Sequence, residues 1–173
     1  MLSVIGVHSS SVGGSSIKGS PGLTAGHAWL TLHYENGRQS SIGLWAEGDV
    51  LSANHLIKDP YGIISGTSEK FEVNFDLELQ KHYKAEASRF FGLYRGQQTK
   101  AIMALGRHAG WRFGHTCASW ATEKLKEIFG VQLASQEGFG LTNTPRALGQ
   151  AIRAAEGRDP TSVSKPKYVG HGP

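Results

Sequence analysis

The first half of the chain carries the residue patterns that are typical of β-strands. Runs of apolar, aromatic and β-branched residues predict strands over Leu2–His8, Gly26–Tyr34 and Gln39–Ala46. An Asn-Gly pair, favoured in tight hairpin turns, separates the last two runs. Polar and apolar residues alternate over Glu69–Leu79, which predicts a further half-buried strand. We therefore expect a sheet built from the N-terminal half of the chain.

The second half of the chain repeats its apolar residues at helical spacing. A helix over Gln97–His108 would place Ala101, Ile102 and Leu105 on one apolar stripe. A helix over Cys117–Phe129 would bury a stripe that begins at the cysteine itself. The change from strand period to helical period predicts two helices in this region.

Capping residues indicate where these helices begin and end. Thr116 is a suitable N-cap for the helix that starts at Cys117, and Gly130 follows its last residue as a C′ glycine should. A third helix is predicted by Thr144 followed by Pro145, and it should end near Gly157. Strands followed by helices predict an α+β fold, with an antiparallel sheet packed on a helical layer.

Length and composition limit the number of domains. The chain has 173 residues, of which 39% are hydrophobic and 18% charged, which is too apolar for a disordered chain and fits one domain. We expect a single domain over residues 1–157. Residues 158–173 contain three prolines and predict an extended C-terminal tail.

Several classes of function are excluded by charge and motif. The formal net charge is +4, but the basic residues are scattered and match no nucleic-acid-binding signature. The sequence contains no HExxH motif, so it predicts no metal site of that kind, and we expect no cofactor. We also expect no transmembrane helix, because no apolar run reaches about 18 residues. The N-terminus lacks the basic region of a signal peptide, so we expect synthesis in the cytoplasm.

The only cysteine, Cys117, is the first candidate for chemistry. A single thiol cannot form an intrachain disulfide, and it excludes cysteine-rich zinc modules. At the start of a helix, the free amide groups and the helix dipole favour the thiolate, which is the nucleophilic form of cysteine. The alternative is a buried structural cysteine that behaves as a small hydrophobe.

A thiolate nucleophile needs a base, and His27 is the best candidate because it opens the most clearly predicted strand. His115 is an alternative candidate for the base, but it is better placed to stabilise the oxyanion that forms in the reaction. A two-residue turn would place His27 opposite Ala46 and beside Glu47, the nearest carboxylate that could orient the imidazole. Strict pleating would direct Glu47 to the other face, so this role needs a bulge or a curled strand end. An ordinary solvated Glu47 is the alternative.

Aromatic residues of the hairpin and of the segment before Cys117 are candidates for substrate binding. A groove for an extended peptide would be lined by Trp29, Trp45, Trp111 and His115. Packing in the core is the alternative for the tryptophans, including Trp120.

Four segments, GLTAGHAW, SIGLWAEG, GHTCASWATE and TNTPRALGQAI in that order, resemble a known family. The chain is similar from Gly22 to Ile152 to the circularly permuted branch of the NlpC/P60-like papain-fold cysteine peptidases. More narrowly, it resembles the amidase effectors that bacteria deliver by type VI secretion. His27 precedes Cys117 by 90 positions, which is the permuted order of the two residues.

The resemblance implies a papain-like catalytic domain that cleaves amide bonds of peptidoglycan stem peptides or crosslinks. Cys117 would be the nucleophile, His27 the general base and Glu47 the third catalytic residue. The resemblance further implies an antibacterial toxin that is exported by a secretion apparatus, acts in the periplasm of a recipient bacterium and is blocked by a cognate immunity protein. Two alternatives are a permuted acyltransferase or lipid or thioester hydrolase, and a non-enzymatic binding module.

Overall fold

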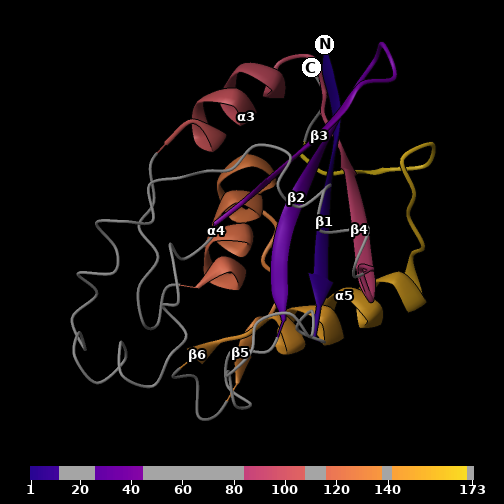
Figure 1. The fold of residues 1–173 in the computed structure, drawn as a ribbon. Helices are drawn as coiled ribbons and strands as arrows, with labels where there is room; N and C mark the ends of the chain where they lie inside the picture. Colours follow the sequence, from indigo (N-terminus) through magenta and orange to yellow (C-terminus); the bar gives the residue numbers. More distant parts are fainter. Residues whose placement is uncertain (12–25, 45–83, 108–115, 138–141, 171–173) are drawn as a thin grey trace.

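A computed structural model describes residues 1–11, 26–44, 84–107, 116–137 and 142–170 of the chain. These residues form an α+β fold with a five-stranded sheet, a two-stranded sheet and three helices (Figure 1). The strand predicted over Glu69–Leu79 lies outside the described residues.

The five-stranded sheet has the order β3-β2-β1-β4-β7. Its strands are β1 (Leu2–Ser10), β2 (His27–Tyr34), β3 (Gln39–Gly43), β4 (Ala87–Gly92) and β7 (Lys167–Tyr168). Each neighbouring pair is antiparallel except β4 and β7, which are parallel. The expected antiparallel sheet is therefore present as four strands, and β7 makes the whole sheet mixed.

The hairpin between β2 and β3 has a longer turn than the sequence predicted. Trp29 pairs with Gly43 and His33 with Gln39, so the register is shifted by one residue. The backbone N–H of Tyr34 donates to Arg38 O at 2.9 Å, which encloses a three-residue loop. Gly37, the last residue of that loop, has φ +79°, as expected when an extra left-handed residue follows the turn. The predicted register of a two-residue turn is therefore wrong by one residue, while Ala46 and Glu47, which that register placed near His27, lie outside the described residues.

Replacing Gly37 with alanine should lower the free energy of unfolding by about 1 kcal/mol, because alanine disfavours a left-handed backbone. A Cβ at this position would meet no atom within 4 Å, so backbone strain is the only cost. Urea denaturation measures the change. Gly37→Asn is the control and should lose less, since asparagine tolerates this region. An alanine variant as stable as the wild type would contradict the assignment.

The two faces of the sheet differ in character. One, here called the helix face, carries apolar side chains of β1, β2 and β4 that form one core with the helices, among them Ile5, Val7, Ala28, Leu30 and Phe91. The other, here called the histidine face, carries His8, His27, Trp29, Thr31 and His33, which alternate with the core residues along β1 and β2. The pleat thus separates a hydrophobic face from a polar aromatic one.

Three helices complete the core: α3 (Gln97–Leu105), α4 (Cys117–Phe129) and α5 (Pro145–Arg158). Helix α4 lies against β2 (Figure 1). Its predicted bounds are confirmed, with Thr116 as N-cap and Gly130 in the left-handed conformation at φ +71°. Helix α5 begins at Pro145 after the N-cap Thr144, also as predicted, and ends at Arg158.

The apolar stripe predicted for α3 is partly wrong. Ala101, Ala104 and Leu105 are buried, whereas Ile102 is 61% exposed. The buried stripe follows the spacing i, i+3 and i+4, and this rotation of the helix directs Ile102 away from the core. The regular helix also ends at Leu105, before the predicted limit.

The segment after α5, which the sequence predicted as an extended tail, lies against β4. The buried Arg89 side chain donates to Glu156 at 2.7 Å and to the Asp159 backbone O at 2.9 Å. The backbone N–H of Phe90 donates to Thr161 Oγ1 at 2.9 Å. The segment then forms β7 beside β4. The described part of this segment therefore contains a turn, in which Ser162 and Lys165 exchange backbone hydrogen bonds, and it completes the sheet through β7.

Candidate functional site

Cys117 is the first residue of α4 and lies at the point where that helix meets the sheet layer. The preceding Thr116 has an extended backbone with φ −90° and ψ 179°. Its backbone N–H donates to Ser119 Oγ at 3.2 Å, and its carbonyl accepts from Trp120 N at 2.9 Å. The first turn of α4 is therefore well fixed around the cysteine. The Cys117 residue is 7% exposed.

A second element, the segment that precedes α5, is bound to this helix start. Thr116 Oγ1 donates to the backbone O of Asn143 at 2.9 Å, and Asn143 Nδ2 donates to Ser119 Oγ at 2.9 Å. Ser135 Oγ donates to Asn143 Oδ1 at 2.7 Å. Asn143 belongs to β6 (Thr142–Asn143), which pairs with β5 (Gln136–Glu137). Asn143 therefore holds the start of α4 against the start of α5.

The start of α5 is in turn bound to the end of β1. Thr144 Oγ1 accepts from the backbone N–H of Ala147 at 3.1 Å and caps the helix. Ser9 Oγ donates to the backbone O of Pro145 at 2.5 Å. Ser10, the next residue of β1, pairs with His27 in the sheet. These contacts bring the starts of α4 and α5 to the end of the sheet where β2 begins.

His27 and Cys117 therefore lie at the same end of the fold, but the pleat directs them to opposite faces. The His27 ring stacks on Trp29, with ring centroids 5.7 Å apart and an interplanar angle of 6°, which places it on the histidine face. Cys117 belongs to the core cluster of the helix face, together with Ala28. Gly26 precedes His27 with φ +116°, a backbone conformation that favours glycine. The structure brings the two residues to one end without aligning their side chains.

Four of the predicted site residues, Glu47, Trp45, Trp111 and His115, lie outside the described residues. Trp29 and Trp120 are both fully buried, which agrees with packing in the core. Trp29 lies between two histidines, because its ring also stacks on His8 at a centroid distance of 5.3 Å. In this conformation Trp29 supports the histidine face and presents no surface to a ligand.

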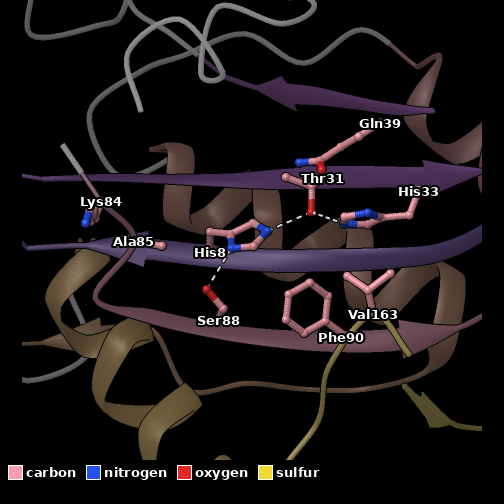
Figure 2. A pocket seen from close by; sticks show the side chains of 9 residues that line it. All are labelled: His8, Thr31, His33, Gln39, Lys84, Ala85, Ser88, Phe90 and Val163. Atoms are coloured by element: carbon pink, nitrogen blue, oxygen red, sulfur yellow. Dashed lines mark hydrogen bonds between the residues drawn. The ribbon is translucent and has the colours of Figure 1, made fainter. Parts of the chain in front are cut away.

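The structure also shows a polar cluster that sequence reasoning missed. His8 Nδ1 lies 2.8 Å from Ser88 Oγ, and His8 Nε2 lies 2.7 Å from Thr31 Oγ1 (Figure 2). The same Thr31 oxygen is 2.9 Å from His33 Nε2. The alternation of His27, Trp29, Thr31 and His33 along β2 was the available signal, since residues two apart share one face of a strand.

This cluster lines a pocket of about 470 Å³ on the histidine face (Figure 2). Its described walls are His8, Thr31, His33, Gln39, Lys84, Ala85, Ser88, Phe90 and Val163. The volume lies within the range of about 300–1,000 Å³ that small-molecule sites occupy.

Burial governs the protonation of both histidines in the pocket. Burial, and secondarily the charge of His33, lowers the pKa of His8 from 6.5 to about 3. Burial also lowers the pKa of His33 below 6.5. Both rings are therefore neutral at pH 7, and His33 is the one that takes up a proton first as the pH falls.

The part of the chain that the structure describes contains no group of three His, Cys, Asp or Glu residues that could hold a metal ion. None of its helices is both long enough and apolar enough to cross a membrane.

Comparison with protein-family models, with curated proteins and with solved structures finds no match to this chain. The structure itself defines an α+β fold class, with a mixed five-stranded sheet and three helices in the described residues.

Proposed function

We propose that the chain is a thiol-dependent amide hydrolase with Cys117 as its nucleophile. The observation that carries the proposal is the position of Cys117 as first residue of α4, at the end of the sheet where α5 and β2 also begin. The Asn143 contacts fix the helix start, so the amide groups of the first turn are oriented before a substrate arrives.

Cys117 and His27 divide the chemistry between them. His27 takes the proton of the Cys117 thiol, the resulting thiolate attacks the amide carbonyl to form an S–C bond, and the amides of the first turn of α4 stabilise the oxyanion. The C–N bond then breaks while His27 donates a proton to the leaving amine. Water finally hydrolyses the thioester, which releases the acid and restores the thiol. Losing one oxyanion donor in such sites costs about 100- to 1,000-fold in rate.

This mechanism requires His27 to reach the helix face during the reaction. Its ring lies on the histidine face, stacked on Trp29. Because His27 is the first residue of β2 and follows Gly26 at φ +116°, rotation at this strand end is the route by which its side chain would approach Cys117. Glu47 keeps its proposed role as the third residue.

The proposal extends to the biological setting that the sequence resemblance implies. The fold would be a permuted papain-like domain, and the substrate the stem peptides or crosslinks of peptidoglycan. The chain would act as an antibacterial toxin in the periplasm of a recipient cell, after export by a secretion apparatus, and a cognate immunity protein would protect the producing cell. The net charge of +4 suits the anionic cell wall.

Digestion of purified Gram-negative sacculi tests the proposal. The wild-type chain should release soluble fragments in which stem-peptide amide bonds are cut, each cleavage adding one water to the mass of the products. Chromatography and mass spectrometry of the fragments identify the bond. A muramidase digest, which cuts only the glycan, provides the control. Sacculi that release nothing above the buffer blank, or only glycan fragments, would contradict the proposal.

A binding module is the second candidate function. It is favoured by the burial of Cys117 in the core cluster, which is the setting of a structural cysteine. It predicts no fragments in the sacculus digest. A lipid or thioester hydrolase would instead cleave a p-nitrophenyl acyl ester of long chain and leave the sacculi intact. The same two assays therefore separate the three functions.

A further inference from the structure

The pocket on the histidine face contains a continuous chain of hydrogen bonds. It runs from Ser88 through His8 and Thr31 to His33, with donor–acceptor distances of 2.8, 2.7 and 2.9 Å (Figure 2). Thr31 Oγ1 lies between two ring nitrogens, and a hydroxyl has a single proton to donate. It therefore donates to one histidine and accepts from the other, so the whole chain of bonds has a direction.

The protonation state of His33 sets that direction. When both nitrogens of His33 carry protons, Nε2 must donate to Thr31, and Thr31 must donate to Nε2 of His8. Neutral His8 then carries its proton on Nδ1 and donates it to Ser88 Oγ. The proton of Ser88 is left available to a ligand. A proton taken up at His33 thus converts Ser88 into a donor at the other end of the pocket.

The rest of the pocket suits an anion that has an apolar part. Lys84 and Ser88 lie at one end, and His33 and Val163 lie at the other, with the Phe90 ring between them (Figure 2). Among the described lining residues none is acidic, and the titratable ones are His8, His33 and Lys84. Phe90 and Val163 provide an apolar wall.

We propose that this pocket binds a small carboxylate that carries an apolar group. The carboxylate accepts the proton of Ser88 near the Lys84 ammonium, and the apolar group lies along Phe90 towards Val163. The hydrogen-bond chain couples this binding to protonation of His33. The site is distinct from Cys117 and does not depend on hydrolysis, so it is tested in a Cys117→Ala chain, in which a failure of the proposed function cannot affect the result.

The expected pH dependence follows from the coupling. Because a bound carboxylate favours the protonated form of His33, binding of the carboxylate and of the proton strengthen each other. Affinity should increase on the order of fivefold as the pH falls through the pKa of His33, which burial holds below 6.5. His8, with its pKa near 3, stays neutral throughout.

Titration of the histidine ring signals by NMR tests the site. The probes are isovalerate, its neutral amide isovaleramide, and acetate, which lacks the apolar group. Isovalerate should shift the His8 and His33 signals in a saturable manner, acetate should bind several-fold more weakly, and isovaleramide should leave the signals in place. N-acetylvaline carries the same kind of carboxylate at the end of a peptide bond. Comparing its affinity with that of isovalerate shows whether the pocket takes its carboxylate from a peptide C-terminus or from a free acid.

Matched variants test each part of the site, after thermal unfolding has shown that they fold. Lys84→Gln should weaken isovalerate binding several-fold. Lys100→Gln, which removes the same charge from an exposed position of α3, should not weaken it. Thr31→Val keeps His33 but breaks the hydrogen-bond chain, and it should remove the pH dependence. Equal binding of isovaleramide, an absence of any probe-induced shift, or full pH dependence in Thr31→Val would overturn the proposal.

Discussion

A chain in which Cys117 is replaced by alanine is expected to lose amide hydrolysis, with kcat lower on the order of 10,000-fold or more. The thiolate is the nucleophile that attacks the amide in the proposed mechanism, so without it the oxyanion site can give only residual catalysis. The fold should persist, because alanine retains the Cβ and suits the first turn of a helix. The measurement is the rate of fragment release from sacculi, with the thermal midpoint recorded in parallel.

The control for this loss lies one turn further along the same helix. Thr122 donates its hydroxyl proton within α4, where Ala118 O and Ser119 O are its acceptors at 2.9 Å. Thr122→Ala should therefore keep full activity. His27→Ala should lower kcat by about 100- to 10,000-fold if His27 is the base. Unchanged activity in Cys117→Ala would contradict the mechanism, and unchanged activity in His27→Ala would reject His27 as the base.

The second large effect is a loss of stability in acid that originates at His8. The unfolded chain binds a proton at this residue near pH 6.5, whereas the folded chain does so only near pH 3. The contribution of His8 to the free energy of unfolding is therefore fully present above about pH 6.5. It decreases as the pH falls towards 3, by up to about 1.4 kcal/mol per pH unit. Between pH 6.5 and pH 4.5 we expect His8 alone to remove about 2–3 kcal/mol. Guanidinium denaturation at a series of pH values measures this slope.

A variant that cannot titrate separates His8 from other groups. His8→Gln keeps hydrogen-bonding groups for Ser88 and Thr31 and should lose most of the slope, even if it is less stable at pH 7. The hydrogen bond from Lys167, followed by the charges of Lys167 and Arg89, lowers the pKa of Asp159 below 3.8, so that carboxylate contributes only at more acid pH. A slope in His8→Gln equal to that of the wild type would contradict the assignment.

Local signals in the sequence predicted much of the fold. Helix α4 was placed correctly from its cap residues, because both of its ends carry local signals: the backbone N–H of Thr116 donates to Ser119 within the first turn, and Gly130 adopts the left-handed conformation. The hairpin strands were found from their apolar pattern. Their register was not, since a two-residue and a three-residue turn both accommodate an Asn-Gly pair, and the difference is the left-handed Gly37.

Elements that depend on distant partners were not predicted. Strand β4 has a charged Arg89 inside it, whose hydrogen-bond partners Glu156 and Asp159 come from a distant part of the chain. Strand β7 forms because Lys167 and Tyr168 pair with β4. Propensity alone carries no information about such pairings.

The candidate site shows the same division between local and distant information. The position of Cys117 at a helix start followed from its neighbours in sequence. The role of Asn143 did not, because its contacts with Thr116 and Ser119 depend on the approach of two helices. The direction of the His27 ring depends on its stacking with Trp29, which the pleat of β2 determines.

The segment after α5 also protects the protein from self-association. A strand at the border of a sheet presents unpaired backbone groups that can template pairing with another molecule. In this chain Thr161 accepts from Phe90, and β7 pairs with Phe91 and Gly92, so the outer edge of β4 is occupied by the protein itself. The segment after α5 thereby serves as a barrier against edge-to-edge aggregation at β4.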